Sequence, residues 1–94
     1  MDGPMMANKR SDDRVAELAA AVTLRRKELG LLQAELANLA GCSERFVHTV
    51  EHGKQTVRLD KLLDVLEVLG LGLVVAPGAG SVTVPEERGE GEEA

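Results

Sequence analysis

The chain has 94 residues and a formal net charge of −5, and this length limits it to one domain with a small core. It contains one Phe, no Trp and no Tyr, which argues against a large apolar ligand pocket and against stacking on single-stranded nucleic acid. The single cysteine excludes an intramolecular disulfide. No run of about 18 apolar residues and no apolar signal core is present, so we expect a soluble cytoplasmic protein with no membrane partner.

The negative charge is concentrated at the C-terminal end of the sequence. Residues 85–94 contain five Glu and one Arg, which gives −4, whereas residues 1–84 contain 10 basic and 11 acidic residues, which gives −1. The part expected to fold is therefore nearly neutral, which permits nucleic-acid binding without indicating it. Residues 77–94 are rich in Gly and Glu, and we predict that they form a flexible, solvated tail.

The N-terminal part of the sequence predicts one long helix. Residues 1–10 are polar and are expected to be flexible. Apolar residues then recur on one face over residues 11–30, which predicts a helix. Ser11 or Asp12 is suited to cap its start, and Gly30 to end it.

Three further helices are predicted downstream. Residues 31–40 and 43–53 each have the length and apolar spacing of a helix of about two turns. Residues 58–70 are the most regular, because leucines recur at i, i+3, i+4, i+7 and i+10. The predicted stops of these three helices are Gly41, Gly53 and Gly70.

A short apolar segment that ends in two valines follows the last helix, and it predicts a strand over residues 71–76. A lone strand cannot form a sheet, so it must pair with residues 81–84 or with the same strand of a second copy. We favour the second copy, since a two-fold axis makes that pairing self-complementary. The fold class predicted is all-α, with four helices and a short C-terminal β-strand that pairs across a homodimer. The residues assigned to this dimer strand are Leu71, Leu73, Val74 and Val75.

Two short helices joined by a tight turn at Gly41 fit a helix-turn-helix, here placed within residues 11–70. In that motif the first helix braces the second, which lies in the major groove of DNA. Glycine in the turn tolerates a positive φ, and the small Ala37 allows the two helices to cross closely.

The stretch "LRRKELGLLQAELANLAGCSERFVHTVEHGK" at residues 24–54 is similar to the XRE-type helix-turn-helix of Cro and the phage repressors. The resemblance extends over residues 22–70 and implies a compact, four-helix, lambda-repressor-like domain. It also implies that Arg26 and Glu51 pair, linking the first helix to the third. The positions that carry it are Arg26, Gly30, Gln33, Leu36, Ala37, Gly41, Ser43, Glu51, Gly53 and Lys54.

The chain departs from the family pattern at three positions. Leu32 stands where the family prefers a Thr, Ser or Asn cap, which costs a side-chain cap of about 1 kcal/mol. Cys42 replaces a branched apolar residue. Glu44 places an acidic group at a groove-facing position, where it would repel phosphate unless it accepts from a cytosine amino group.

A narrower resemblance covers "QTVRLDKLLDVLEVLGLGLVV" at residues 55–75, which looks like the end of HipB-type antitoxins. In that group a strand after the fourth helix pairs across the dimer. Such proteins repress their own operon and bind a HipA-like kinase toxin. The resemblance therefore implies two kinds of partner, double-stranded operator DNA and a kinase toxin.

Candidate DNA contacts follow from where residues fall in the motif. We assign base contacts to the exposed face of the third helix, where an Arg can bind guanine through two hydrogen bonds and a Thr can contact a thymine methyl group. Phosphate contacts are assigned to the starts of the second and third helices and to the loop after the third. The base-contacting set is Glu44, Arg45 and Thr49. The phosphate-contacting set is Gln33, Ser43, Lys54, Gln55 and Arg58, with Phe46 and His48 as possible groove contacts.

The spacing H-x-x-E-H at His48, Glu51 and His52 raises the possibility of a zinc site, because histidines at i and i+4 share a helix face. The chain has no third histidine and is too small for the usual substrate cleft. We therefore expect no metal, no cofactor and no enzymatic activity. Cys42 is interpreted as a small apolar plug in the turn and not as a redox sensor.

Three functional hypotheses follow from these observations. The first, which we favour, is an antitoxin that represses its own operon and neutralises a kinase toxin. The second is a stand-alone phage-type or restriction-control regulator. The third is a protein-binding module that has lost DNA contact.

Overall fold

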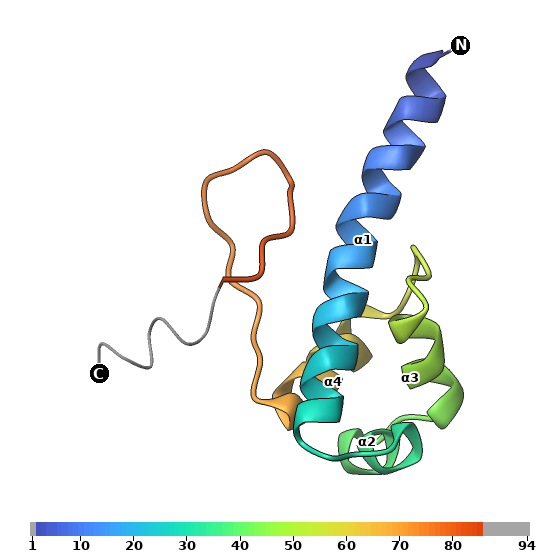
Figure 1. The fold of residues 1–94 in the computed structure, drawn as a ribbon, viewed down its shortest axis with the longest axis vertical. Coiled ribbons are helices and arrows are strands. Elements are labelled where there is room, and N and C mark those ends of the chain that lie inside the picture. Colours follow the sequence, from blue (N-terminus) through green and yellow to red (C-terminus); the bar gives the residue numbers. More distant parts are fainter. Residues whose placement is uncertain (1, 86–94) are drawn as a thin grey trace.

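The computed structural model describes the backbone of residues 2–85 and the side chains of residues 13–85. Four α-helices follow one another along the chain (Figure 1): α1 (Asp2–Glu28), α2 (Gln33–Ala40), α3 (Glu44–Glu51) and α4 (Leu59–Leu69). The long α1 extends at its N-terminal end beyond the other three helices, which gather around its C-terminal part. The all-α part of the prediction is confirmed for the described residues.

The helix α1 begins earlier than the sequence pattern predicted. It starts at Asp2, so Ser11 and Asp12 lie inside it and do not cap its start. Pro4 falls in the first turn, where a proline is tolerated because the missing N–H would have no partner in the helix. The flexibility predicted for residues 1–10 stays a prediction.

The core is aliphatic and is built from all four helices. Val22 of α1, Leu36 of α2, Val47 of α3 and Val65 of α4 have no exposed surface. Phe46, the single aromatic residue, is partly buried and packs at the edge of this core. The other buried members of the core are Ala37, Ala40, Val50, Leu62, Leu66 and Leu69.

All four helices end in the same way, at the glycines that the sequence indicated as stops. Gly30, Gly41, Gly53 and Gly70 have φ between 72° and 76°. After each helix, the N–H groups of the glycine and of the next residue bond back to carbonyls of the last turn, which is the Schellman arrangement. The ends of the helices are therefore fixed locally.

The predicted strand is not formed in the single chain. Residues 71–85 carry no strand, and residues 71–76 do not pair with residues 81–84. A strand exists only through ladder hydrogen bonds to a neighbour, and one copy of this segment supplies none. Its side chains remain outside the core, with Val74 88% exposed and Val75 99% exposed.

Candidate nucleic-acid interface

The turn between α2 and α3 is stabilised by hydrogen bonds to α2 and to α4. Gly41 adopts φ 73°, and the N–H of Cys42 donates to the carbonyl of Ala37 at 3.0 Å. From the other side, Lys61 Nζ of α4 donates to the Gly41 carbonyl at 3.0 Å. Ala37 is buried, with 3% of its surface exposed. The two helices therefore have the fixed mutual orientation that a helix-turn-helix requires.

The start of α3 is capped by Ser43. Its Oγ accepts a hydrogen bond from the backbone N–H of Phe46 at 3.0 Å, which satisfies one of the free donors of the first turn. Ser43 is exposed in this position. Its phosphate contact stays a prediction.

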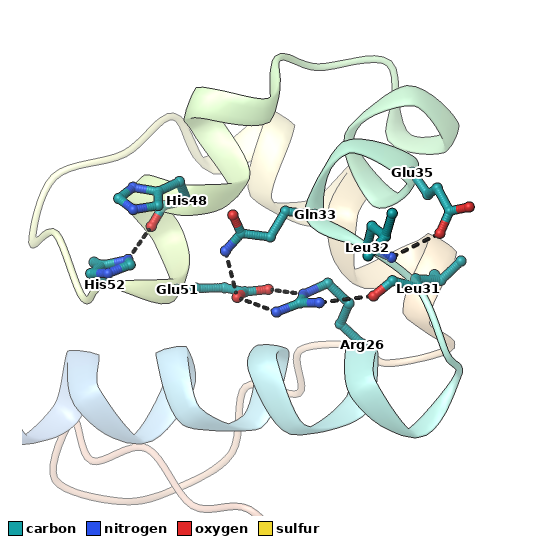
Figure 2. Close-up of polar contacts among 8 residues, drawn as sticks. All are labelled: Arg26, Leu31, Leu32, Gln33, Glu35, His48, Glu51 and His52. Atoms are coloured by element: carbon teal, nitrogen blue, oxygen red, sulfur yellow. Dashed lines mark hydrogen bonds and ion pairs between the residues drawn. The ribbon is translucent and has the colours of Figure 1, made fainter.

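The start of α2 lacks a side-chain cap, as the sequence indicated. Leu32 occupies the cap position and offers no acceptor. The Glu35 carboxylate reaches back instead and accepts from the Leu32 N–H at 2.8 Å (Figure 2). Half of a capping box is therefore present.

Most of the predicted contact residues of α3 and the following loop surround one hollow of about 380 Å³. Three segments contribute to it: the start and exposed face of α3, the loop after α3, and the residue before α4. Two members, Thr56 and Val57, were missed by the sequence reasoning, because loop residues show no periodicity. The lining residues are Ser43, Arg45, Phe46, Thr49, Lys54, Thr56, Val57 and Arg58.

Glu44 lies apart from this hollow. It lines a second hollow, of about 440 Å³, together with Glu35, Asn38 and Cys42. Consecutive residues of a helix point about 100° apart, so Glu44 and Arg45 present opposite charges to different sides of α3. Gln55 and His48 are exposed and do not line the hollow around Arg45.

The polar groups around Arg45 differ in whether they already form hydrogen bonds or ion pairs within the protein. Among the described residues, the side chains of Arg45 and Lys54 have no hydrogen-bond or ion-pair partner. The Thr49 hydroxyl donates to the carbonyl of Arg45 at 2.8 Å, so its hydrogen is not available to a base, whereas its oxygen can still accept and its methyl group can make apolar contact. Arg58 is bound to the Asp60 carboxylate through Nε at 3.1 Å and Nη2 at 2.7 Å.

Behind α3, a polar network connects three helices (Figure 2). Arg26 donates to both carboxylate oxygens of Glu51, from Nε to Oε2 at 2.7 Å and from Nη2 to Oε1 at 3.0 Å. Its Nη1 donates to the carbonyl of Leu31 at 2.8 Å. Gln33 Nε2 also donates to Glu51 Oε1, at 2.9 Å. The structure thus contains the pair implied by the resemblance, together with a third member, Gln33, that the sequence assigned only to phosphate.

The Glu51 carboxylate is nearly enclosed, with 4% of its side chain exposed. Burial alone raises the pKa of this carboxyl, but the hydrogen bonds from Arg26 and Gln33 and the charge of Arg26 hold the pKa below the ordinary value of 4.5. The carboxylate therefore stays ionised at neutral pH. An amide nitrogen has two hydrogens, so Gln33 keeps one donor for the phosphate contact, which stays a prediction.

The H-x-x-E-H spacing does not bring three ligands together. The rings of His48 and His52 stack with their centroids 3.9 Å apart, and His52 Nδ1 lies 2.9 Å from the His48 carbonyl oxygen. Glu51 of the motif is occupied by Arg26 and Gln33. No group of three or more metal-binding side chains exists among residues 13–85.

Cys42 is half-buried and packs against the core. Burial raises the pKa of its thiol, and nearby Asp64 adds to the effect while Lys61 opposes it. A thiol that stays protonated is a weak nucleophile, which agrees with the interpretation as a plug in the turn.

Comparison with known proteins identifies the family. The helix-turn-helix domain family matches residues 17–76. The chain belongs to this helix-turn-helix family. It is also 44% identical, over 64 residues, to an uncharacterized HTH-type transcriptional regulator, y4mF, of Sinorhizobium fredii (strain NBRC 101917 / NGR234), covering 67% of this chain and 84% of y4mF.

Among solved structures, a chain titled MDT Protein has a similar fold. The TM-score is 0.63 at 25% sequence identity, over 69% of this chain and 92% of that chain. Together with the family match, the relative supports a DNA-binding transcription regulator. Within residues 2–85, no helix has the length and apolar character needed to cross a membrane.

Proposed function

We propose that this helix-turn-helix protein is a sequence-specific transcriptional repressor that binds operator DNA. The observation that carries the proposal is the hollow around Arg45 and Thr49. It is bordered by the unpaired cations Arg45 and Lys54 and lies on the exposed side of α3. Cations at the edges of a surface hold phosphates, while polar and methyl groups at its centre meet base edges.

In the proposed complex, α3 lies in the major groove. Arg45 donates two hydrogen bonds to a guanine, and the Thr49 methyl group contacts a thymine. Lys54 and the N-terminal ends of α2 and α3 hold phosphates. Repression results from occupation of the DNA, and no chemical step is involved.

We further propose a homodimer in which the segment around Val74 and Val75 pairs with its symmetry mate. Two features support it: the two valines have the β-branched side chains typical of strands, and in the single chain they are almost fully exposed. Main-chain pairing would give partners to the N–H and C=O groups on the edge that faces the second copy. Two recognition helices related by a two-fold axis then contact half-sites about one helical turn, ~34 Å, apart.

The proposed partner of the dimer is a kinase toxin, which makes the protein the antitoxin of a HipBA-like pair that also represses its own operon in the cytoplasm. The support is the sequence resemblance of residues 55–75. A stand-alone repressor is the alternative outcome of the test below.

The test is affinity capture of the tagged full-length protein from its own cells, followed by mass spectrometry of bound protein and sequencing of bound DNA. Recovery of a kinase and of the protein's own promoter supports the antitoxin. Promoter DNA without a kinase identifies a stand-alone repressor. A protein partner without DNA refutes the repressor, and Arg45→Ala, captured in parallel, shows whether DNA recovery depends on the proposed surface.

A test of the dimer uses sedimentation equilibrium of the wild type and of Val74→Pro. Proline has no N–H and cannot complete a ladder, so the variant is expected to sediment as a monomer. Because Val74 is 88% exposed, the helical domain should keep its stability. A wild type that is monomeric at micromolar concentration would refute the dimer.

A further inference from the structure

Two arginines of α1 form hydrogen bonds to the last residue of α4 and to the segment that follows α4. Arg25 Nε donates to the carbonyl of Leu69 at 2.8 Å, and Arg14 Nη1 donates to the carbonyl of Gly80 at 3.0 Å. In Figure 1 the segment runs along one side of α1. The two arginines are 11 positions apart, which corresponds to about 16 Å along the helix.

The hydrogen bond from Arg25 holds the C-terminal end of α4, where the chain leaves the helix. The Leu69 carbonyl belongs to the last turn, whose acceptors have no partner inside the helix, and Arg25 satisfies it. The guanidinium lies directly against the following turn, because a Cβ on Gly70 would be 3.5 Å from Arg25 Nη2. A cation at this position is also favoured by the negative end of the α4 dipole.

Apolar burial contributes little to holding this segment. Leu73 is 51% exposed, and Val74 and Val75 are 88% and 99% exposed. Leu71 is partly buried against the core, but residues 72–80 are exposed, so beyond Leu71 only polar contacts can give the segment a fixed direction. The contact of Arg25 at Leu69 and the contact of Arg14 at Gly80 therefore hold the two ends of this stretch against α1.

The same helix also fixes the recognition helix. Arg26, the residue after Arg25, pairs with Glu51 at the end of α3. Two consecutive residues of α1 thus hold the end of α3 and the end of α4. Together with the core, to which all four helices contribute, these two contacts of α1 hold the recognition helix and the end of α4 in a fixed relative position.

We propose that Arg25, assisted by Arg14, is a positioning residue that sets the half-site spacing accepted by the dimer. The proposal rests on the proposed dimeric repressor. One base pair changes the separation of half-sites by about 3.4 Å. If the direction of the chain after α4 is fixed, the dimer accepts one half-site spacing. If that direction varies, the dimer accepts several spacings.

The test uses duplexes with two copies of the half-site selected by the wild type, separated in single-base-pair steps. The full-length wild type is expected to favour one spacing over its neighbours by about tenfold, as for a dimer with fixed half-site geometry. Arg25→Met removes the donors and keeps the aliphatic length, and its preference is expected to fall to about twofold. Arg25→Lys retains one charge and should lie between the two.

The matched control is Lys27→Met. Lys27 is exposed, lies in the same turn of α1, and has no side-chain partner among the described residues. The Lys27→Met substitution removes one positive charge, as Arg25→Met does, but leaves the contact with α4 intact. This variant should therefore keep the wild-type preference for one half-site spacing. Affinity for a duplex with a single half-site is measured for every variant and should be unchanged, which separates lost positioning from lost folding.

Each outcome decides between the alternatives. A wild-type profile that is sharp and is retained by Arg25→Met overturns the inference and leaves the repressor standing. A wild type that fails to dimerise or to bind any duplex refutes the proposed function, and this is seen before any variant is compared. If Arg25→Met unfolds, Arg14→Met replaces it, since this variant leaves the end of α4 intact. An unaltered profile for Arg14→Met then overturns the inference.

Discussion

Arg26 and Glu51 form an almost enclosed two-point ion pair, with Nε 2.7 Å from Oε2 and with 11% and 4% of the two side chains exposed. The pair joins the last turn of α1 to the last residue of α3. The orientation of the recognition helix therefore depends on a contact that lies behind it and not on the DNA-facing surface.

Removal of one member of this pair is expected to destabilise the fold. Glu51→Gln or Arg26→Met leaves the other group enclosed without its partner, which costs about 3–5 kcal/mol. Urea unfolding measures the loss of unfolding free energy in each single variant and in a double variant that combines Arg26→Met with Glu51→Leu. The double variant should lose less than the sum of the single variants, and strict additivity would contradict the coupling.

The same carboxylate predicts a pH dependence. The pKa of Glu51 is lowered in the folded state. The stabilisation that its ionised form gives to the folded state is therefore fully present above the unfolded pKa, near 4.5, and is lost as the pH falls through the lower folded pKa. The difference in unfolding free energy between the wild type and Glu51→Gln should shrink as the pH is lowered from 5 towards 3. A difference that grows in this range would reverse the assigned sign.

The turn itself offers a backbone test at Gly41. Its φ of 73° disfavours any L side chain, although a Cβ there would meet no atom within 4 Å. Gly41→Ala should therefore cost about 1–2 kcal/mol from conformation alone. Gly72→Ala, which has open space and no positive φ, is the control in the same thermal unfolding series, and equal effects at both positions would refute the explanation.

Arg45 is expected to affect specificity. Arg45→Ala should remove about 1–3 kcal/mol of discrimination at one base position of each half-site. Binding of a library of single-base operator variants measures this. If affinity falls by the same factor on every sequence, Arg45 contacts phosphate and not a base.

Lys54 is expected to affect affinity for all sequences alike. Loss of one phosphate contact per subunit reduces the steepness of log K against log salt by about 0.9 for each contact removed. Salt titrations of Lys54→Gln and the wild type on operator and random duplexes provide the measurement, with Lys27→Gln as the control. A salt dependence identical to the wild type would show that Lys54 does not contact phosphate.

Several parts of the fold could be predicted from the sequence because they depend on local interactions. The glycine stops were predictable since a left-handed residue after a helix satisfies carbonyls in the preceding turn. The Ser43 cap was predictable for the same reason, as its acceptor lies three residues away. The aliphatic core followed from helical periodicity and from the near absence of aromatic residues.

The start of α1 and the strand show the limits of local patterns. Polar composition around Pro4 suggested an irregular segment, although proline is compatible with a first helical turn. Residues 71–76 have strand propensity, but a strand requires a neighbour. The sequence of one chain does not state where that neighbour comes from.

By itself, the sequence determined the existence of the four helices, their C-terminal ends at glycines, and the helix-turn-helix between Gln33 and Glu51. The tertiary structure alone showed that Gln33 bonds to Glu51, that Arg25 bonds to the end of α4, and that Glu44 and Arg45 serve different hollows. The physical reason is distance along the chain. Helix caps and stops join residues three to five positions apart, whereas these side chains meet partners 18 and 44 positions away, which only the packing of the helices brings within hydrogen-bonding reach.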